Sequence, residues 1–174
     1  MPNYLKSALV FIFAGIVGGI FLTGVNLWAK ETIEERQLQQ DLAILEDYFP
    51  GVASYKEDEV EGMNAQLVYG KEKEFLGVLM TTRQQGYSDY IVYQLAVDRQ
   101  GKIVGLKVLE HNETEDIGGV IEEPEFREQF LGVSFQDTVS EKVEVVSGAT
   151  ESTRAIIDSV EEVMEVVEEE YLNQ

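Results

Sequence analysis

Ser147-Gly-Ala-Thr-Glu-Ser-Thr153 stands immediately before the most regular apolar stripe of the chain. From Thr153 to Tyr171, apolar residues recur every three or four positions, and acidic residues occupy many of the positions between them. This period predicts an amphipathic helix that packs one face on a core. The stripe consists of Ile156, Val160, Val163, Val167 and Tyr171.

The start of this predicted helix has two chemical interpretations, and the residues alone leave both open. The N–H groups of a first turn and the positive end of the helix dipole favour an anion such as phosphate. Gly148 and Ala149 would keep large side chains away from that anion. Hydroxyls at this position either donate to phosphate oxygens or cap the helix. The hydroxyl residues are Ser147, Thr150, Ser152 and Thr153.

The middle of the chain predicts an antiparallel sheet, because β-branched and aromatic runs alternate with short turns. A short helix is expected at 121–130, and a loop with a final short strand at 132–146. The expected fold class is α+β: an N-terminal transmembrane helix, then an antiparallel-sheet domain with packed helices. The strands are expected at Ala65–Tyr69, Phe75–Thr81, Tyr90–Val97 and Ile103–Leu109.

The N-terminal region predicts a membrane anchor. Residues 7–29 carry no formally charged side chain. As a helix at about 1.5 Å per residue, this run spans the roughly 30 Å hydrocarbon core of a bilayer. Tyr4 and Trp28 lie near its two ends, where aromatic rings favour the interface. The apolar run is longer than a typical signal-peptide core and no Ala-x-Ala site follows, so we expect a retained single-pass helix.

Four segments follow from this interpretation. A short cytoplasmic tail is expected at 1–6, the transmembrane helix at 7–29, a stalk helix at 30–50 and an extracytoplasmic domain at 51–174. Leu38, Leu42, Leu45 and Phe49 form the stripe by which the stalk is expected to pack on the domain. The orientation rests on few charges, chiefly Lys6 in the tail.

Composition excludes several classes of function. The chain has no cysteine, which rules out disulfides, thiol catalysis and cysteine-ligated clusters within it. A single histidine argues against a zinc or haem site built by this chain alone. The net charge is −20, from 33 acidic and 13 basic residues, and it repels nucleic-acid phosphates. We therefore expect no nucleic-acid partner and no resident metal.

Glu144-Val-Val-Ser-Gly-Ala-Thr150 resembles the flavinylation motif of the FMN-binding domain family. That motif has an acidic residue, usually Asp, then two spacers and Ser/Thr-Gly-Ala-Thr before a helix. In the family, the last threonine carries FMN through a phosphoester bond that a dedicated flavin transferase makes. The resemblance implies covalent FMN on Thr150, a phosphoprotein-type threonine ester, with Ser147, Gly148, Ala149, Ser152 and Thr153 around it.

Two upstream segments support the same resemblance. Gly86-Tyr87 and the loop His111–Gly119 are similar to the family's Gly-Tyr and His-x-Glu-Thr-Pro-Gly-Leu-Gly segments, with Gly101-Lys-Ile103 matching its Gly-Lys-Ile turn between them. Glu115 and Asp116 replace the family's Pro and Gly. The resemblance places the flavin ring near this loop, where Glu113 would accept a hydrogen bond from a ring N–H. The implied ring neighbours are Tyr87, Glu113, Thr114 and Gly118.

Within the family, the compact length and the short N-terminal tail are most similar to G subunits of Rnf complexes. These complexes are membrane ferredoxin:NAD⁺ oxidoreductases coupled to Na⁺ or H⁺ transport, and the C subunit of the sodium-pumping NADH:quinone reductase is a relative. The resemblance implies an electron carrier in the cell (inner) membrane that works with other membrane subunits and has no substrate of its own. Three alternatives stay open: a free-standing membrane-anchored flavin reductase, a subunit of a related sodium-pumping quinone reductase, and a non-redox anchored domain whose Ser-Gly-Ala-Thr is only a cap.

Overall fold

The computed structural model describes Gly15 and residues 36–113 and 119–172. Apart from Gly15, the expected transmembrane helix at 7–29 lies outside these residues, as does the tail at 1–6. Within the described ranges, no helix is both long enough and apolar enough to cross a membrane. The residues from Ile44 onward form one compact unit, which contains the sheet and the helices packed on it.

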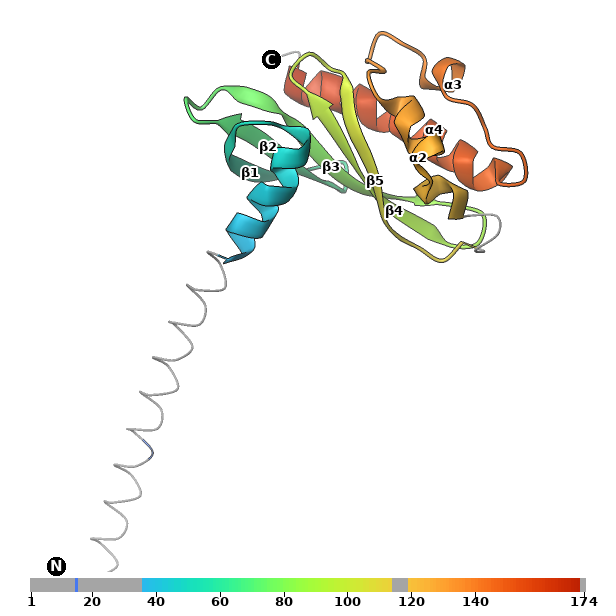
Figure 1. The fold of residues 1–174 in the computed structure, drawn as a ribbon, viewed down its shortest axis with the longest axis horizontal. Helices are drawn as coiled ribbons and strands as arrows, with labels where there is room; N and C mark the ends of the chain where they lie inside the picture. Colours follow the sequence, from blue (N-terminus) through green and yellow to red (C-terminus); the bar gives the residue numbers. More distant parts are fainter. Residues whose placement is uncertain (1–14, 16–35, 114–118, 173–174) are drawn as a thin grey trace, which may run out of the picture. The chain divides into compact units, whose positions relative to one another are not determined.

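The core of this unit is a five-stranded antiparallel sheet in which each strand pairs with the next one along the chain (Figure 1). Four of the strands confirm the sequence prediction and extend it by up to four residues at an end. The strands are β1 (Val52–Val60), β2 (Met63–Gly70), β3 (Phe75–Gln85), β4 (Tyr90–Asp98) and β5 (Ile103–His111). This topology confirms that short connections here make hairpins.

Strand β1 is an edge strand that the sequence analysis did not predict. Its residues are mostly exposed, and charged side chains dominate its second half, so no apolar alternation marks it. Its hairpin to β2 is closed by Glu61 and Gly62, both with positive φ (50° and 77°). A two-residue turn with two left-handed residues matches the twist of paired strands, which explains how this polar segment joins the sheet.

The helices after the sheet are shorter and more divided than predicted. The single helix expected at 121–130 is instead η1 (Gly119–Glu122), α2 (Pro124–Arg127) and η2 (Glu128–Phe130). Pro124 begins α2 because its ring lacks the N–H that a helix interior needs. The expected final strand near 143–146 is wrong: that segment has no strand, and α3 (Val139–Lys142) precedes it.

Helix α4 (Thr150–Val167) confirms the predicted amphipathic helix, and a short π-helical turn (Glu168–Leu172) continues it. Its apolar face packs on one face of the sheet (Figure 1). The four stripe residues within α4 are buried, whereas Tyr171 in the π-helical turn is half-buried. This packing fixes the start of α4 at one end of the sheet.

The opposite face of the sheet holds a second, smaller core. Leu79 points into it while its neighbours Val78 and Met80 point to the α4 side, as alternation along a strand requires. Residues 36–48 are helical, and Leu45 and Phe49 at the end of this segment complete the second core. The C-terminal end of the expected stalk is therefore built into the domain.

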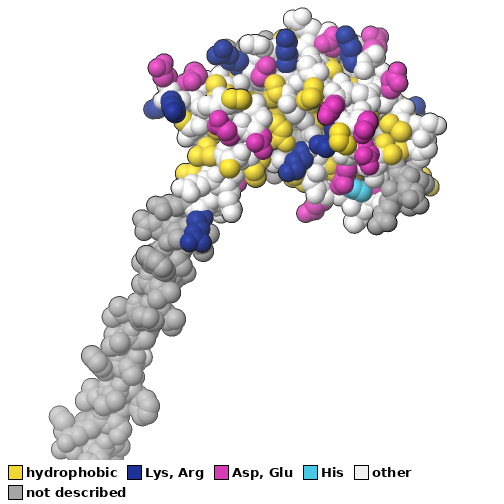
Figure 2. All heavy atoms as spheres, in the orientation of Figure 1, with side chains coloured by type: hydrophobic (Ala, Val, Ile, Leu, Met, Phe, Trp, Pro, Cys, Tyr) yellow, Lys and Arg dark blue, Asp and Glu magenta, His cyan; other side chains and the backbone are white. Residues whose placement is uncertain are grey.

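One face of the domain shows how its surface charges are distributed. On the face shown in Figure 2, acidic and basic side chains are interspersed with hydrophobic ones rather than gathered in one patch. In the described part of the chain, no three His, Asp or Glu side chains are placed to hold a metal ion. The candidate site is therefore described from two segments, the turn before α4 and the turn between β3 and β4.

Candidate functional site

The Ser-Gly-Ala-Thr segment forms a tight turn that leads into α4. Gly148 has a φ of +93°, a conformation that glycine adopts without strain, and a Cβ at this position would meet open space. Ala149 is the N-cap residue; it makes no side-chain cap, and its N–H donates to the carbonyl of Val146 (3.1 Å). The backbone at the start of α4 is thus open to an incoming group at Gly148 and is not capped by the N-cap side chain.

The four predicted hydroxyls divide into two pairs. Ser147 and Thr150 are exposed, whereas Ser152 and Thr153 are buried. The Thr153 hydroxyl donates to the Ala149 carbonyl (2.9 Å) and accepts from the Val146 N–H (3.3 Å). Thr153 therefore holds the turn onto α4, whereas Thr150 is an exposed residue at the first position of this helix.

A cavity of about 270 Å³ lies beside this turn. Tyr87 and residues 148–152 line it, so the structure brings together the two segments singled out in the sequence. Its volume is below the roughly 300–1,000 Å³ of pockets that enclose a drug-sized ligand. A nucleotide-sized cofactor would fit with one part in the cavity and the rest on the surface. Tyr87 is 66% exposed, which leaves its ring accessible at the rim.

The charges around the cavity are unusual for a phosphate site. Of the described residues that line it, none is basic, and Glu151 is acidic. A free phosphate dianion would be attracted only by the backbone and the dipole of α4. An ester of Thr150 would carry one negative charge less, and the covalent bond would replace the missing ion pair.

Glu113 does not line the cavity itself; it is 7% exposed and bonds to Ser152, which does. Its Oε1 accepts from the N–H groups of Ser88 (3.0 Å) and Asp89 (3.3 Å), and its Oε2 accepts from the Ser152 hydroxyl (2.5 Å). Burial raises the pKa of this carboxyl, but the hydrogen bonds from Ser152 and from the N–H groups of residues 87–89 outweigh it. The pKa of Glu113 is therefore below its usual value, and the side chain is an anion at neutral pH.

The loop that follows Glu113 is bounded by His111 and Glu122. Thr114 and Gly118 lie outside the described residues. His111, at the end of β5, spans the base of the loop: its Nδ1 accepts from the Glu113 N–H (3.1 Å), and its Nε2 lies 3.2 Å from Oε1 of Glu122. The histidine thus holds the two ends of the loop.

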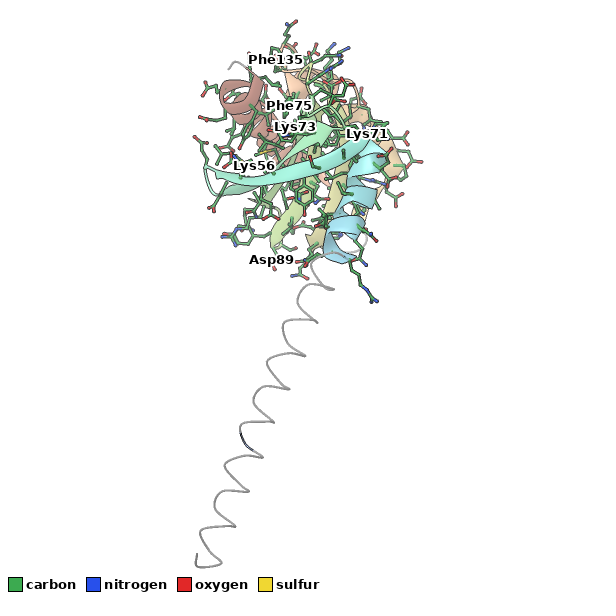
Figure 3. All side chains as sticks on the ribbon, turned by 90° about the vertical axis from the view of Figure 1, so that its left-hand side faces the viewer. Lys56, Lys71, Lys73, Phe75, Asp89 and Phe135 are labelled. Atoms are coloured by element: carbon green, nitrogen blue, oxygen red, sulfur yellow. The ribbon has the colours of Figure 1, made fainter. Side chains whose placement is uncertain are left out.

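The turn between β3 and β4 is the part of the site that the sequence analysis did not identify in full. The sequence motif includes Gly86 and Tyr87. Ser88 and Asp89 bind Glu113 through their backbone N–H groups, and no residue pattern reveals such bonds. Figure 3 shows Asp89 at the end of the domain opposite Phe135. This is the end of the sheet at which β4 begins.

Comparisons with known proteins show which family the segments of this site resemble. Residues 86–165 match the family model described as the FMN-binding domain, and this range includes Tyr87, Glu113 and Thr150. The match begins in the β3–β4 turn and ends within α4, so it includes both segments that line the cavity.

Two curated relatives and one solved structure are similar to the chain. It is 36% identical over 69 residues to the G subunit of the ion-translocating oxidoreductase complex of Methanosarcina acetivorans, covering 37% of each chain. It is 25% identical over 119 residues to the G subunit of the proton-translocating ferredoxin:NAD(+) oxidoreductase complex of Clostridium ljungdahlii, covering 64% of each. The matches thus span 37% and 64% of these relatives' own lengths.

The crystal structure of NqrC from Shewanella oneidensis has a similar fold. The TM-score is 0.50 at 22% identity, over 59% of this chain and 55% of that one. At this identity the likeness establishes the fold alone, an antiparallel sheet with packed helices.

Proposed function

We propose that this protein is the membrane-anchored electron-transfer subunit of an Rnf-type complex and carries FMN as a phosphoester of Thr150. The observation that carries the proposal is the position of Thr150: it is an exposed residue, it begins α4, and it lines the cavity. The names of the two G-subunit relatives support the assignment to such a complex.

The chain's own groups fit the phosphate end of FMN. The backbone of the turn and the positive end of α4 would stabilise the remaining negative charge of the diester. Glu151 on the cavity wall opposes the binding of a dianion, so covalent attachment is favoured over free exchange. When bound, FMN supplies the ability to take up and release electrons one or two at a time.

Tyr87 would contact the flavin at the rim. Its ring is exposed on the same cavity as Thr150, and a flat aromatic side chain packs well against a flat ring. The ribityl chain would lead from the ester on Thr150 toward this rim. Thr114 and Gly118 are proposed neighbours on the strength of the family resemblance.

The experiment uses the full chain, co-expressed with a flavin transferase and run on a denaturing gel. Wild type is expected to give a fluorescent band, and Thr150→Ala is expected to give none. Thr138→Ala is the matched control, because Thr138 is also exposed next to a helix start but lacks the Ser-Gly-Ala sequence before it. A dark wild-type band would favour the non-redox alternative. Purification of the loaded chain without companion membrane subunits would favour a free-standing reductase.

A further inference from the structure

The carboxylate of Glu113 joins three segments that are distant in sequence. It extends from the end of β5, accepts from the backbone of Ser88 and Asp89 in the β3–β4 turn, and accepts from the Ser152 hydroxyl in the first turn of α4. The Ser152 contact spans 39 positions of sequence. Because both oxygens already have protein donors, the carboxylate acts first on the protein around the cavity.

The β3–β4 turn is shaped to receive this carboxylate. A Cβ at Gly86 would overlap Oε1 of Glu113 and Cδ1 of Ile91, so a larger residue there would require these two side-chain ends to shift. The turn is closed by the Gly86 N–H, which donates to the Asp89 carbonyl (2.8 Å). A second tie joins the same two segments, since the Asn112 side-chain amide donates to Oδ2 of Asp89 (2.9 Å).

Tyr87 is held by little burial of its own. With 66% of its surface exposed, its position depends on the turn that carries it rather than on packing. Thr150 lies two residues before Ser152 on α4, and Tyr87 lies one residue before Ser88 in the turn. The Glu113 carboxylate therefore connects the turn that carries Tyr87 with the first turn of α4 that carries Thr150, and both of these residues line the cavity.

We propose that Glu113 and Ser152 are positioning residues for the flavin: their hydrogen bond, with the bonds from Ser88 and Asp89, fixes Tyr87 relative to Thr150 and so orders the flavin ring. This inference rests on the proposed function, and it changes the role expected for Glu113. The carboxylate would set the shape of the site through Tyr87 and α4, in place of a direct bond to a ring N–H.

The test compares variants of the full, FMN-loaded chain. Glu113→Gln and Ser152→Ala weaken or remove the bridge, and Gly86→Ala displaces the carboxylate without removing it. The matched control is Ser159→Ala: Ser159 is also buried on α4, two turns further along, and its hydroxyl bonds to Tyr93 (2.7 Å) instead of the site. The control loses a comparable buried hydrogen bond within the same helix.

Two spectroscopic quantities report the order of the ring, the visible circular dichroism of the flavin and its fluorescence anisotropy, and a third quantity, its reduction potential, reports the surroundings of the ring. In the three bridge variants we expect covalent loading with a loss of visible dichroism, a fall in anisotropy and a shifted potential. In Ser159→Ala we expect wild-type values for all three, although its free energy of unfolding falls. Equal spectra in the bridge variants and the control would overturn the proposal.

A second arm needs no flavin, and so separates this inference from the proposed function. Hydrogen exchange of the 86–89 backbone is measured in the unmodified chain. Faster exchange of this turn in Glu113→Gln and Ser152→Ala than in Ser159→Ala supports the bridge, even if wild type proves to carry no FMN. Unchanged exchange in all variants would overturn the bridge, even if Thr150 proves to be loaded.

Discussion

The phenolic oxygen of Tyr93 lies 2.7 Å from the hydroxyl of Ser159, within the core between β4 and α4. Both side chains are buried. Burial, with a smaller contribution from the charge of Glu162, raises the pKa of Tyr93, so the phenol stays neutral; the bond to Ser159 opposes this only in part. This pair ties the helix that carries Thr150 to the centre of the sheet.

Removing Ser159 alone should destabilise the fold more than removing both members of this pair. Ser159→Ala leaves the Tyr93 hydroxyl buried without a partner, a cost of about 1–3 kcal/mol in the free energy of unfolding. Tyr93→Phe should cost less, because a serine in a helix can donate to the backbone of the preceding turn. Denaturant titration of the two single variants and the double variant measures these changes in the free energy of unfolding. If the costs of the two single variants add up to the cost of the double variant, a direct hydrogen bond between Tyr93 and Ser159 is contradicted.

The end of the 36–48 helix should contribute to the stability of the sheet. Leu45→Ala is expected to lower the free energy of unfolding by about 2–5 kcal/mol, because its side chain is 0% exposed in the second core. Ile44→Ala is the control: Ile44 is 43% exposed, and its loss should change stability by about 0.5 kcal/mol or less. Equal effects in thermal or denaturant unfolding would show that the helix end does not belong to this core.

Acid should act partly through Glu113. Its lowered pKa means that the unfolded chain binds a proton at this carboxyl before the folded chain does. The contribution of Glu113 is therefore fully present above the usual pKa of a glutamate and is lost as pH falls through the lower, folded-state pKa. The free energy of unfolding, measured between neutral and acid pH, should fall less steeply in Glu113→Gln than in wild type. Parallel curves would contradict the assignment.

The orientation of the chain in the membrane can be tested with a single cysteine, since the chain has none. Thr138→Cys places a thiol at an exposed position of the domain. A membrane-impermeant maleimide should label it in intact spheroplasts, because the domain is expected outside the cell membrane. Wild type supplies the unlabelled control. Labelling that appears only after permeabilisation would place the domain on the cytoplasmic side.

Much of the fold follows from local patterns. The stripe from Ile156 to Val167 and the β-branched runs of β3 and β4 identify their elements, because periodicity and burial agree there. Strand β1 is not predictable in this way, since an edge strand with exposed charges lacks an apolar face. The pattern around Pro124 predicts one helix, because the sequence does not reveal short 3₁₀ turns.

The site is predictable in its residues but not in their roles. Motif resemblance locates Glu113, Ser152 and Thr150, and the cavity brings Tyr87 beside the helix start. The bond between Glu113 and Ser152 joins residues 39 positions apart, and the Ser88 and Asp89 donors are backbone groups. Such contacts depend on the three-dimensional path of the chain, which side-chain patterns do not record.

The central claim is the ester at Thr150, and the intact mass of the chain purified from membranes with its companion subunits tests it most directly. We predict that wild type exceeds the mass of its sequence by one FMN less one water. We predict that Thr150→Ala has the mass of its sequence alone. An unmodified wild type from cells with an active flavin transferase, or an equal mass gain in Thr150→Ala, would contradict the account.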